Sequence, residues 1–412
     1  MIWLRFAFDN LLLAPLASIV NVLLMALGTA SIVLLLVAGT QLSDTLTRDA
    51  RGIDLVIGAS GSPAQLILST VYHADIPPGN ISLAEASQWA NDARVAVAAP
   101  LALGDSYRGF RIAGTTRSYP ALLNGSLAQG TYWSAPLQAV LGASVARKTG
   151  LVIGSTFNGA HGLSAASHDH DEDGYRVVGI LADSGTVLDR LILTSLDSVW
   201  RLHGQDVTHD HVIEQDHERD HNGSPFSSTN LEVTALLLKY ETPLAAMSMP
   251  GEVNSVAGFQ AAAPAVEISR ILQLIGLGLD GLRAFAWVLI VTACLSVFAA
   301  LYGSLRHRRR DLAMLRCLGA TRTELFLTLM SEGLLLSLCG VLLGFLLGHL
   351  TMTIVSAWLE ASRGVTLAAW QWVSSETSLL GVLFCVSVVS AILPAWQAYR
   401  TDVARTLAEA TS

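Results

Sequence analysis

Histidines and acidic residues gather in one part of the chain, with a spacing that suits metal binding. Eight of the eleven histidines lie between residues 161 and 221, and aspartates alternate with them at 168–171 and 209–211. Imidazole and carboxylate groups together are ligands that Zn²⁺ and similar ions accept. The predicted ligands are His168, His170, His203, His209, His211, His217 and His221. A zinc site within the segment 161–223 is therefore the first hypothesis.

Two expected strands, Tyr175–Leu181 and Leu188–Thr194, lie between the two histidine clusters. Residues 183–186, Asp-Ser-Gly-Thr, are typical of a turn between them. A hairpin at this point would bring the two clusters together and complete one site. A solvated acidic loop without metal has the same composition, so that alternative stays open.

Calcium and catalytic motifs are not found in the sequence. Asp169, Asp171 and Asp173 begin like an EF-hand loop, but Ile180 stands where the closing carboxylate belongs. No Gly-Lys-Ser/Thr occurs, so the chain has no P-loop for ATP. No serine stands at a nucleophile elbow, and the cysteines, at 294, 317, 339 and 385, avoid the histidine-rich part. We expect a chain that is not an enzyme and, apart from Zn²⁺, binds no cofactor directly.

The composition places these residues in a membrane protein. Hydrophobic residues make up 52% of the 412 positions and charged residues only 14%. Four apolar runs are long enough to cross a bilayer, which takes roughly 20 residues each. They cover residues 16–39, 282–302, 325–349 and 378–398. Residues 1–15 form an interfacial lead-in that we interpret as the start of an uncleaved anchor; a cleaved signal peptide is the alternative.

A large polar block, residues 41–280, separates the first and second runs. It mixes short expected helices, such as 63–72 and 83–93, with short expected strands, and residues 243–258 are weakly patterned and predicted as a connector. The predicted fold class is thus a membrane α-helical protein with four transmembrane helices and a large α+β extracytoplasmic domain. A helix over 264–282 is expected to continue into the second span.

Arginine counts predict the orientation. The loop 303–324 holds six arginines, whereas the loop 356–377 holds only Arg363. Basic residues stay in the cytoplasm, so both termini, including the tail 399–412, are predicted there. The large domain and the loop 356–377 are then outside, which means the periplasm for a protein of an inner membrane. A net charge of −8 argues against nucleic acid as a partner. The apolar runs are expected to contact membrane lipid.

The loop 303–324 contains a short amphipathic helix in a basic setting. Leu312, Leu315 and Leu318 recur at three-residue steps, with Asp311 and Arg316 beside them and Gly319 at the end. The stretch from Arg310 to Ala320, followed by Glu332-Gly333 and a glycine-spaced helix, resembles ABC permeases of the MacB/FtsX/LolE type. The resemblance implies that these six residues dock on a separate ATPase subunit. A helix lying on the bilayer or on the spans is the alternative.

The third span carries glycines at four-residue spacing, Gly340, Gly344 and Gly348. Small residues on one face allow helices to approach closely in lipid. The resemblance implies an interface either within the subunit or with a second copy. Glu332, in the same span, is an intramembrane carboxylate with either a functional or a structural role.

The resemblance extends more loosely to residues 119–130, 140–154 and 177–190, which are similar to the extracytoplasmic domain of MacB-type permeases. It implies the permease subunit of a type VII ABC system, with two permease copies (a homodimer or a pair of related chains) and two ATPase subunits that bind ATP. Movement of the outer domains would drive transport or extrusion of a substrate, and the histidine-rich segment adds the hypothesis of a link to divalent metal. The alternative is an FtsX-like signalling subunit that regulates an extracytoplasmic partner protein.

Overall fold

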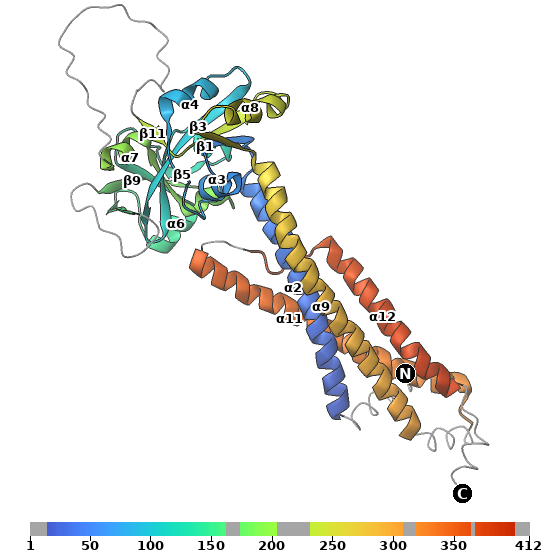
Figure 1. Ribbon diagram of the computed structural model, residues 1–412. Coiled ribbons are helices and arrows are strands. Elements are labelled where there is room, and N and C mark those ends of the chain that lie inside the picture. The colour runs from blue at the N-terminus through green and yellow to red at the C-terminus, as the bar shows by residue number, and fades with distance from the viewer. Residues whose placement is uncertain (1–14, 162–173, 204–230, 308–318, 364–366, 400–412) are drawn as a thin grey trace, which may run out of the picture. The chain divides into compact units, whose positions relative to one another are not determined.

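The computed structural model describes residues 15–161, 174–203, 231–307, 319–363 and 367–399 (Figure 1). The chain divides into two compact units. Residues 1–42 and 275–412 form the membrane unit, and residues 43–274 form the outer domain. Each unit has its own hydrophobic core.

The membrane unit contains four helices that are long and apolar enough to cross a bilayer. They are α2 (Pro15–Asp49), α9 (Pro264–His307), α11 (Arg322–Arg363) and α12 (Ser374–Tyr399). The first turns of α9 belong to the outer domain, and the helix continues without a break into the membrane unit. In α9, three glycines with open space around them, Gly276, Gly278 and Gly281, follow directly after this boundary.

The helices extend further than the apolar runs, so two loops are shorter than predicted. α11 ends at Arg363 and α12 begins at Ser374, which leaves 364–373 of the loop expected over 356–377. The loop expected over 303–324 is likewise helical at both ends, up to His307 and from Arg322. Polar residues continue a helix beyond the hydrocarbon region, and hydropathy alone does not detect this.

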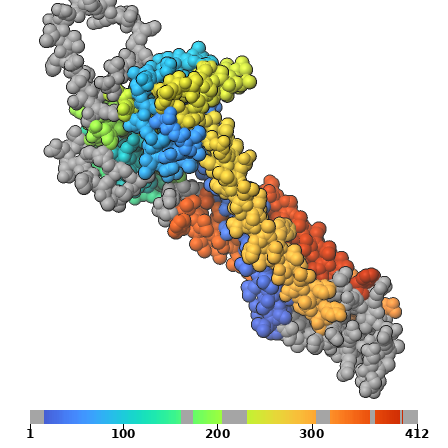
Figure 2. Space-filling model, in the orientation of Figure 1, coloured from blue at the N-terminus to red at the C-terminus, as the bar shows by residue number. Residues whose placement is uncertain are grey.

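Side chains from all four helices meet in the core of the membrane unit, among them Val37, Ile290, Met352 and Leu383. Gly28 of α2 lies against Ile290 of α9, and the Ser296 hydroxyl on α9 donates to the Asn21 side chain on α2. The outer side of α9, the yellow-to-orange column in Figure 2, exposes large apolar residues such as Phe285, Val288 and Leu295. An apolar exterior over a packed interior is what a lipid environment requires.

The outer domain is built on an eleven-stranded mixed sheet. The order along its main path is β13-β1-β12-β3-β4-β10-β6-β9-β5, with β7 beside β9 and β8 beside β3. The strands are β1 (Leu55–Ala59), β3 (Val95–Tyr107), β4 (Phe110–Thr115), β5 (Leu127–Gly130), β6 (Gln138–Leu141), β7 (Thr156–Phe157), β8 (Ala160–His161), β9 (Tyr175–Leu181), β10 (Leu191–Ser195), β12 (Ala235–Tyr240) and β13 (Phe259–Ala262). A separate pair joins β2 (Ile81–Ser82) to β11 (Glu232–Val233).

The hairpin predicted from residues 175–194 is wrong. β9 and β10 are separated by β6, which pairs in parallel with β9 and antiparallel with β10. Residues 188–190, expected in the second strand, belong instead to a 3₁₀ turn, η1 (Val187–Arg190), before β10 begins. The turn at 183–186 therefore leads through η1 to β10, which does not pair with β9. The earlier strand β6 lies between the two.

Helices cover both faces of the sheet. Neighbouring residues of β1 and β12 alternate between two hydrophobic clusters, as in Val56 and Leu237 on one face and Ile57 and Leu236 on the other. The helices are α3 (Pro63–Thr70), α4 (Leu83–Ala90), α5 (Ser118–Leu122), α6 (Ala143–Thr149), α7 (Leu196–Leu202) and α8 (Ala245–Asn254). α4 and α8 lie on the same side of the domain (Figure 2) and contribute to one cluster.

The helix α8 lies where the sequence predicts a connector over 243–258. Pro250 inside the helix and a weak apolar pattern conceal it. Met249 and Val253 are fully buried on one side, so tertiary packing stabilises a segment whose own propensity is low.

Candidate functional site

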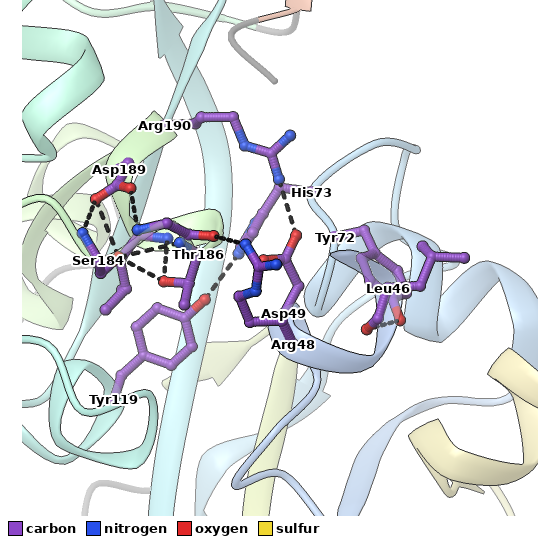
Figure 3. A network of polar contacts seen from close by, with 12 residues as sticks. Leu46, Arg48, Asp49, Tyr72, His73, Tyr119, Ser184, Thr186, Asp189 and Arg190 are labelled. Carbon is purple, nitrogen blue, oxygen red and sulfur yellow. Dashed lines mark hydrogen bonds and ion pairs between the residues drawn. The ribbon is translucent and has the colours of Figure 1, made fainter. Parts of the chain in front are cut away.

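The end of α2 is held inside the outer domain by polar contacts from three parts of the chain (Figure 3). The Arg190 guanidinium lies 3.1 Å from the Asp49 carboxylate, whose side chain is 3% exposed. The Tyr72 hydroxyl donates to the Leu46 carbonyl at 2.9 Å, and Arg48 donates to the Gly185 carbonyl at 3.2 Å. We call this set of contacts, made by Leu46, Arg48 and Asp49 of α2, the helix–domain joint.

The turn that receives Arg48 is itself fixed by Asp189. The Asp189 carboxylate accepts hydrogen bonds from the backbone amides of Ser184 at 2.9 Å and of Gly185 at 2.7 Å. Burial raises the pKa of the Asp189 carboxyl, against the hydrogen bonds from Ser184, which lower it. Gly185 has φ +65°, a conformation that suits glycine. Asp189 and Arg190 are consecutive in η1. This one turn of 3₁₀ helix therefore positions both the 184–186 turn, through Asp189, and the guanidinium that pairs with Asp49.

A buried histidine lies next to the joint. His73 Nε2 is 2.9 Å from the Tyr119 hydroxyl on α5. Burial, together with the positive charges of Arg111 and Arg190, lowers the pKa of His73 to about 3. The imidazole is therefore neutral at physiological pH. Among the residues that the structure describes, no three potential metal ligands gather here or elsewhere. The arrangement holds the end of a helix.

The three glycines of the third span face α2 of the same chain. A Cβ atom at Gly340 would lie 2.6 Å from the Met25 Cβ, and one at Gly344 would lie 2.5 Å from the Ala26 carbonyl oxygen. At Gly348 the nearest atom is the Val33 Cβ, at 2.9 Å. Of the two interfaces left open by the sequence, the structure places these glycines at one within the subunit. Thus α2, which continues into the outer domain, is also the helix against which α11 packs at these three glycines.

A cleft of about 460 Å³ opens in the outer domain. Its lining combines the indoles of Trp133 and Trp200 with the charged side chains of Arg117 and Asp197. Arg117 also donates to the Trp133 carbonyl at 3.2 Å. The hydroxyl residues Thr115, Thr116, Ser134 and Ser195 also line it, so the cleft offers apolar surface and polar groups in similar measure.

Two family models match the chain. The MacB-like periplasmic core domain matches residues 18–235, more than half of the chain, and the FtsX-like permease C-terminal domain matches residues 283–403. The chain belongs to the MacB/FtsX-type ABC permeases. The two matches follow the architecture described above, since the second covers the carboxy-terminal three membrane helices and the first covers α2 with most of the outer domain.

Relatives of this MacB/FtsX-type permease include two longer proteins. The macrolide export ATP-binding/permease protein MacB of Bdellovibrio bacteriovorus is 22% identical over 215 residues, which is 51% of this chain and 31% of MacB. An uncharacterized ABC transporter permease of Methanocaldococcus jannaschii is 26% identical over 237 residues, 57% of this chain and 54% of that protein. The matched region therefore spans about a third and about half of these relatives.

Solved structures similar to the permease comprise outer domains. The periplasmic region of MacB from Actinobacillus actinomycetemcomitans aligns with a TM-score of 0.34 and 14% identity, over 54% of this chain and 95% of that one. The extracellular domain of the ABC-type transporter YknZ from Gram-positive bacteria aligns with a TM-score of 0.31 and 11% identity, over 51% and 98%.

Most of the predicted ATPase-docking residues lie outside the described part of the permease. These are Asp311, Leu312, Leu315, Arg316 and Leu318. Gly319 is described and has φ +104°. Directly after it, α11 begins with a capping box: the Thr321 amide donates to the Glu324 carboxylate at 2.7 Å, and the Glu324 amide donates to the Thr321 hydroxyl at 3.3 Å. The re-entry of the chain into the third span thus starts at a defined position.

Six of the seven predicted zinc ligands also lie outside the described residues, namely His168, His170, His209, His211, His217 and His221. The seventh, His203, has its Nε2 3.4 Å from the Asp105 carboxylate on β3. The hydrogen bond with Asp105 raises the pKa of His203 despite its partial burial. Asp105 is also the register partner of His161, where β8 ends. His161 and His203, the last described residues before the two histidine-rich segments, are thus both neighbours of Asp105.

Sequence reasoning did not find the helix–domain joint. Asp49 and Arg190 are 141 positions apart, and neither belongs to a motif. One signal was available: Arg48-Asp49 ends a long apolar helix, and charged residues that the fold buries need partners. The turn at 183–186 was recognised, but nothing in its sequence indicates that it contacts α2.

Proposed function

We propose that this chain is the permease subunit of an ABC system and that a separate ATPase subunit drives its outer domain. The observation that carries the proposal is the continuity of α2 and α9 from the membrane unit into the outer domain, with the end of α2 held by the helix–domain joint. ATP binding by two ATPase subunits would act on the helix that the sequence predicts over 311–318, in each of two permease copies. The resulting movement transports or extrudes a substrate, and the chain itself hydrolyses no ATP.

The proposed orientation puts both termini and the 303–324 loop in the cytoplasm and the outer domain in the periplasm of a cell with an inner membrane. The six arginines of that loop support it. A separate ATPase that docks on this loop would then lie in the cytoplasm, where ATP is available. A separate ATPase is needed in this proposal because the sequence contains no P-loop.

The test of the proposal is the effect of Leu315→Asp on ATPase association. The full-length permease is purified with a mild cross-linker from its own cells, and the ATP-binding subunit that accompanies it is identified. A charge on the apolar face of the 311–318 helix should abolish this association and the effect of the permease on ATP hydrolysis. Arg322→Gln, at the exposed start of α11, is the control. Unchanged association of Leu315→Asp would show that the ATPase docks elsewhere.

A signalling role, in which the permease switches an extracytoplasmic partner protein, is a second candidate. The cleft lined by Trp133, Trp200, Arg117 and Asp197 supports it, because indoles and unlike charges suit recognition of a protein segment. Arg117→Ala together with Asp197→Ala should reduce capture of a periplasmic partner while leaving ATPase association unchanged. Loss of transport without loss of partner capture would favour the first candidate.

Zinc binding is a third part of the proposal. The contact of His203 with Asp105, beside the end of β8, supports it, since it brings the starting points of both histidine-rich segments together without the hairpin. Calorimetric titration of the full-length protein with Zn²⁺ should show binding that is lost when either His168/His170 or His209/His211 is changed to alanine. Binding should also weaken below about pH 6, where imidazole takes up protons. Retention of affinity after removal of one cluster would show that the clusters do not form one site.

A further inference from the structure

A histidine and a glutamate face each other inside the membrane unit, outside every site described so far. His349 on α11 is 2% exposed at its side chain, and Glu376 in the first turn of α12 is fully buried. His349 Nε2 lies 3.5 Å from Glu376 Oε1. Ionisable side chains within membrane-spanning helices are costly, so such a pair has a functional reason by default.

The hydrogen bond at the other ring nitrogen fixes the tautomer of His349. Nδ1 lies 2.8 Å from the Ala369 carbonyl oxygen. A carbonyl only accepts, so Nδ1 carries a hydrogen and donates it. In the neutral ring Nε2 is then a bare acceptor, and it faces the oxygen of a carboxylate, which is also an acceptor. The two atoms attract each other only when one proton lies on Nε2 or on the Glu376 oxygen.

None of the three side chains described next, which surround the pair, carries a charge that could take the place of this proton between the two acceptors. Phe345 of α11 meets the imidazole edge-to-face with ring centroids 4.4 Å apart, and Trp370 stacks on it at 5.2 Å. α2 contributes Gln41, which donates to the Ala368 carbonyl. None of these three side chains titrates. With no proton, the pair would consist of two buried acceptors in contact, which costs free energy.

The same contacts hold the segment 367–373, which connects α11 and α12, against the helices. His349 binds the Ala369 carbonyl, Gln41 binds the Ala368 carbonyl, and the Ser356 hydroxyl donates to the Leu367 carbonyl at 2.7 Å. Side chains of α2 and α11 thus bind three consecutive backbone carbonyls. Glu376 follows three residues after the segment ends and binds α12 to the same imidazole.

We propose that His349 and Glu376 form a binding site for a single proton, and that this proton keeps the 367–373 segment docked on α2 and α11. The proton is shared between Nε2 and a carboxylate oxygen, as imidazolium with carboxylate or as neutral imidazole with carboxylic acid. Its release separates the two acceptors and loosens the segment.

The first experiment counts the proton on the unmodified pair. Solid-state NMR of the full-length protein in lipid nanodiscs uses ¹⁵N-histidine and ¹³C-glutamate, with His349 assigned through its contact with a ¹³C-labelled Ala369 carbonyl. At neutral pH we expect one proton: imidazolium beside carboxylate, or neutral imidazole beside carboxylic acid. Neutral imidazole beside carboxylate, or imidazolium beside carboxylic acid, would overturn the proposal.

The second experiment tests docking of the segment. A cysteine at the buried Ala369, in a background without other cysteines, reports exposure through its rate of reaction with a soluble thiol reagent. Each rate is divided by that of a cysteine at the exposed Ser375. Glu376→Gln keeps a donor toward Nε2 and should leave the ratio unchanged, whereas Glu376→Ala should raise it severalfold. Equal ratios in both variants would show that the pair does not hold the segment.

Discussion

Asp49 and Arg190 are the residues on which the helix–domain joint most depends. Asp49 is buried and Arg190 is its only charged partner at ion-pair distance among the described residues. Removal of one member of a buried pair typically costs about 3–5 kcal/mol. Burial already raises the pKa of Asp49 to about 6, so without Arg190 this carboxyl takes up a proton near neutral pH and the cost stays at or below the lower end of that range. We therefore expect Arg190→Met to lower the free energy of unfolding by about 3 kcal/mol, measured by chemical denaturation of the full-length protein in detergent.

Arg147→Met is the matched control for this prediction. Its ion pair with Asp183 has a similar distance, 2.9 Å, but both side chains are more than half exposed. Exposed pairs contribute at most about 1 kcal/mol. The double variant Asp49→Asn with Arg190→Met removes both charges and should recover much of the lost stability. Similar losses for Arg147→Met and Arg190→Met would refute the assignment of the joint.

His73 predicts how the outer domain responds to acid. The pKa of His73 is about 3 in the folded protein, whereas an unfolded histidine titrates near about 6.5. Between these values the unfolded chain binds a proton that the folded domain does not, so stability is full above about pH 6.5 and falls toward pH 3. The slope from this residue is at most about 1.4 kcal/mol per pH unit.

The variant that isolates this effect is His73→Asn. Position 73 has φ +53°, which asparagine tolerates better than most residues. Unfolding of the wild type and the variant is compared between about pH 7 and about pH 5, above the ordinary carboxylate pKa values of about 4. Asp49, whose pKa burial raises to about 6, titrates in both proteins and does not distinguish them. The variant should be less stable at neutral pH but should lose less stability on acidification. Parallel curves would mean that His73 is not the group responsible.

At the scale of elements, the glycine face of α11 lies tightly against α2. Gly344→Leu should lower the thermal midpoint in detergent by several degrees, because its Cβ would overlap the Ala26 carbonyl. Gly381→Leu, on α12, meets no atom within 4 Å and serves as control. A midpoint unchanged in Gly344→Leu would show that the α2–α11 contact is dispensable.

The elements that could be predicted from the sequence are those with a strong local signal. The four apolar helices and β9 (Tyr175–Leu181) have one, and the structure shows them. The central position of β6 between β9 and β10 has none, because a pairing partner from elsewhere in the chain decides it. For the same reason the pairs Asp49–Arg190 and His349–Glu376 escaped notice, since each partner looks ordinary by itself.

At the scale of the whole molecule, the predicted topology can be tested by labelling intact cells. Ser134, in the outer domain, and Thr323, at the start of α11, are both exposed. Single cysteines at these positions, in a cysteine-free chain, should differ: the first should react with an impermeant thiol reagent and the second only after the membrane is permeabilised. Labelling at position 323 in intact cells would reverse the orientation.

The three glycines of α9 have a mechanical consequence for the permease. Gly276, Gly278 and Gly281 fall within six positions of a helix of 44 residues, just after the outer domain ends at Leu274. Glycine costs a helix roughly 1 kcal/mol per residue relative to alanine. We therefore expect α9 to bend most easily over residues 276–281. A load applied at either end of the helix would produce its largest curvature there.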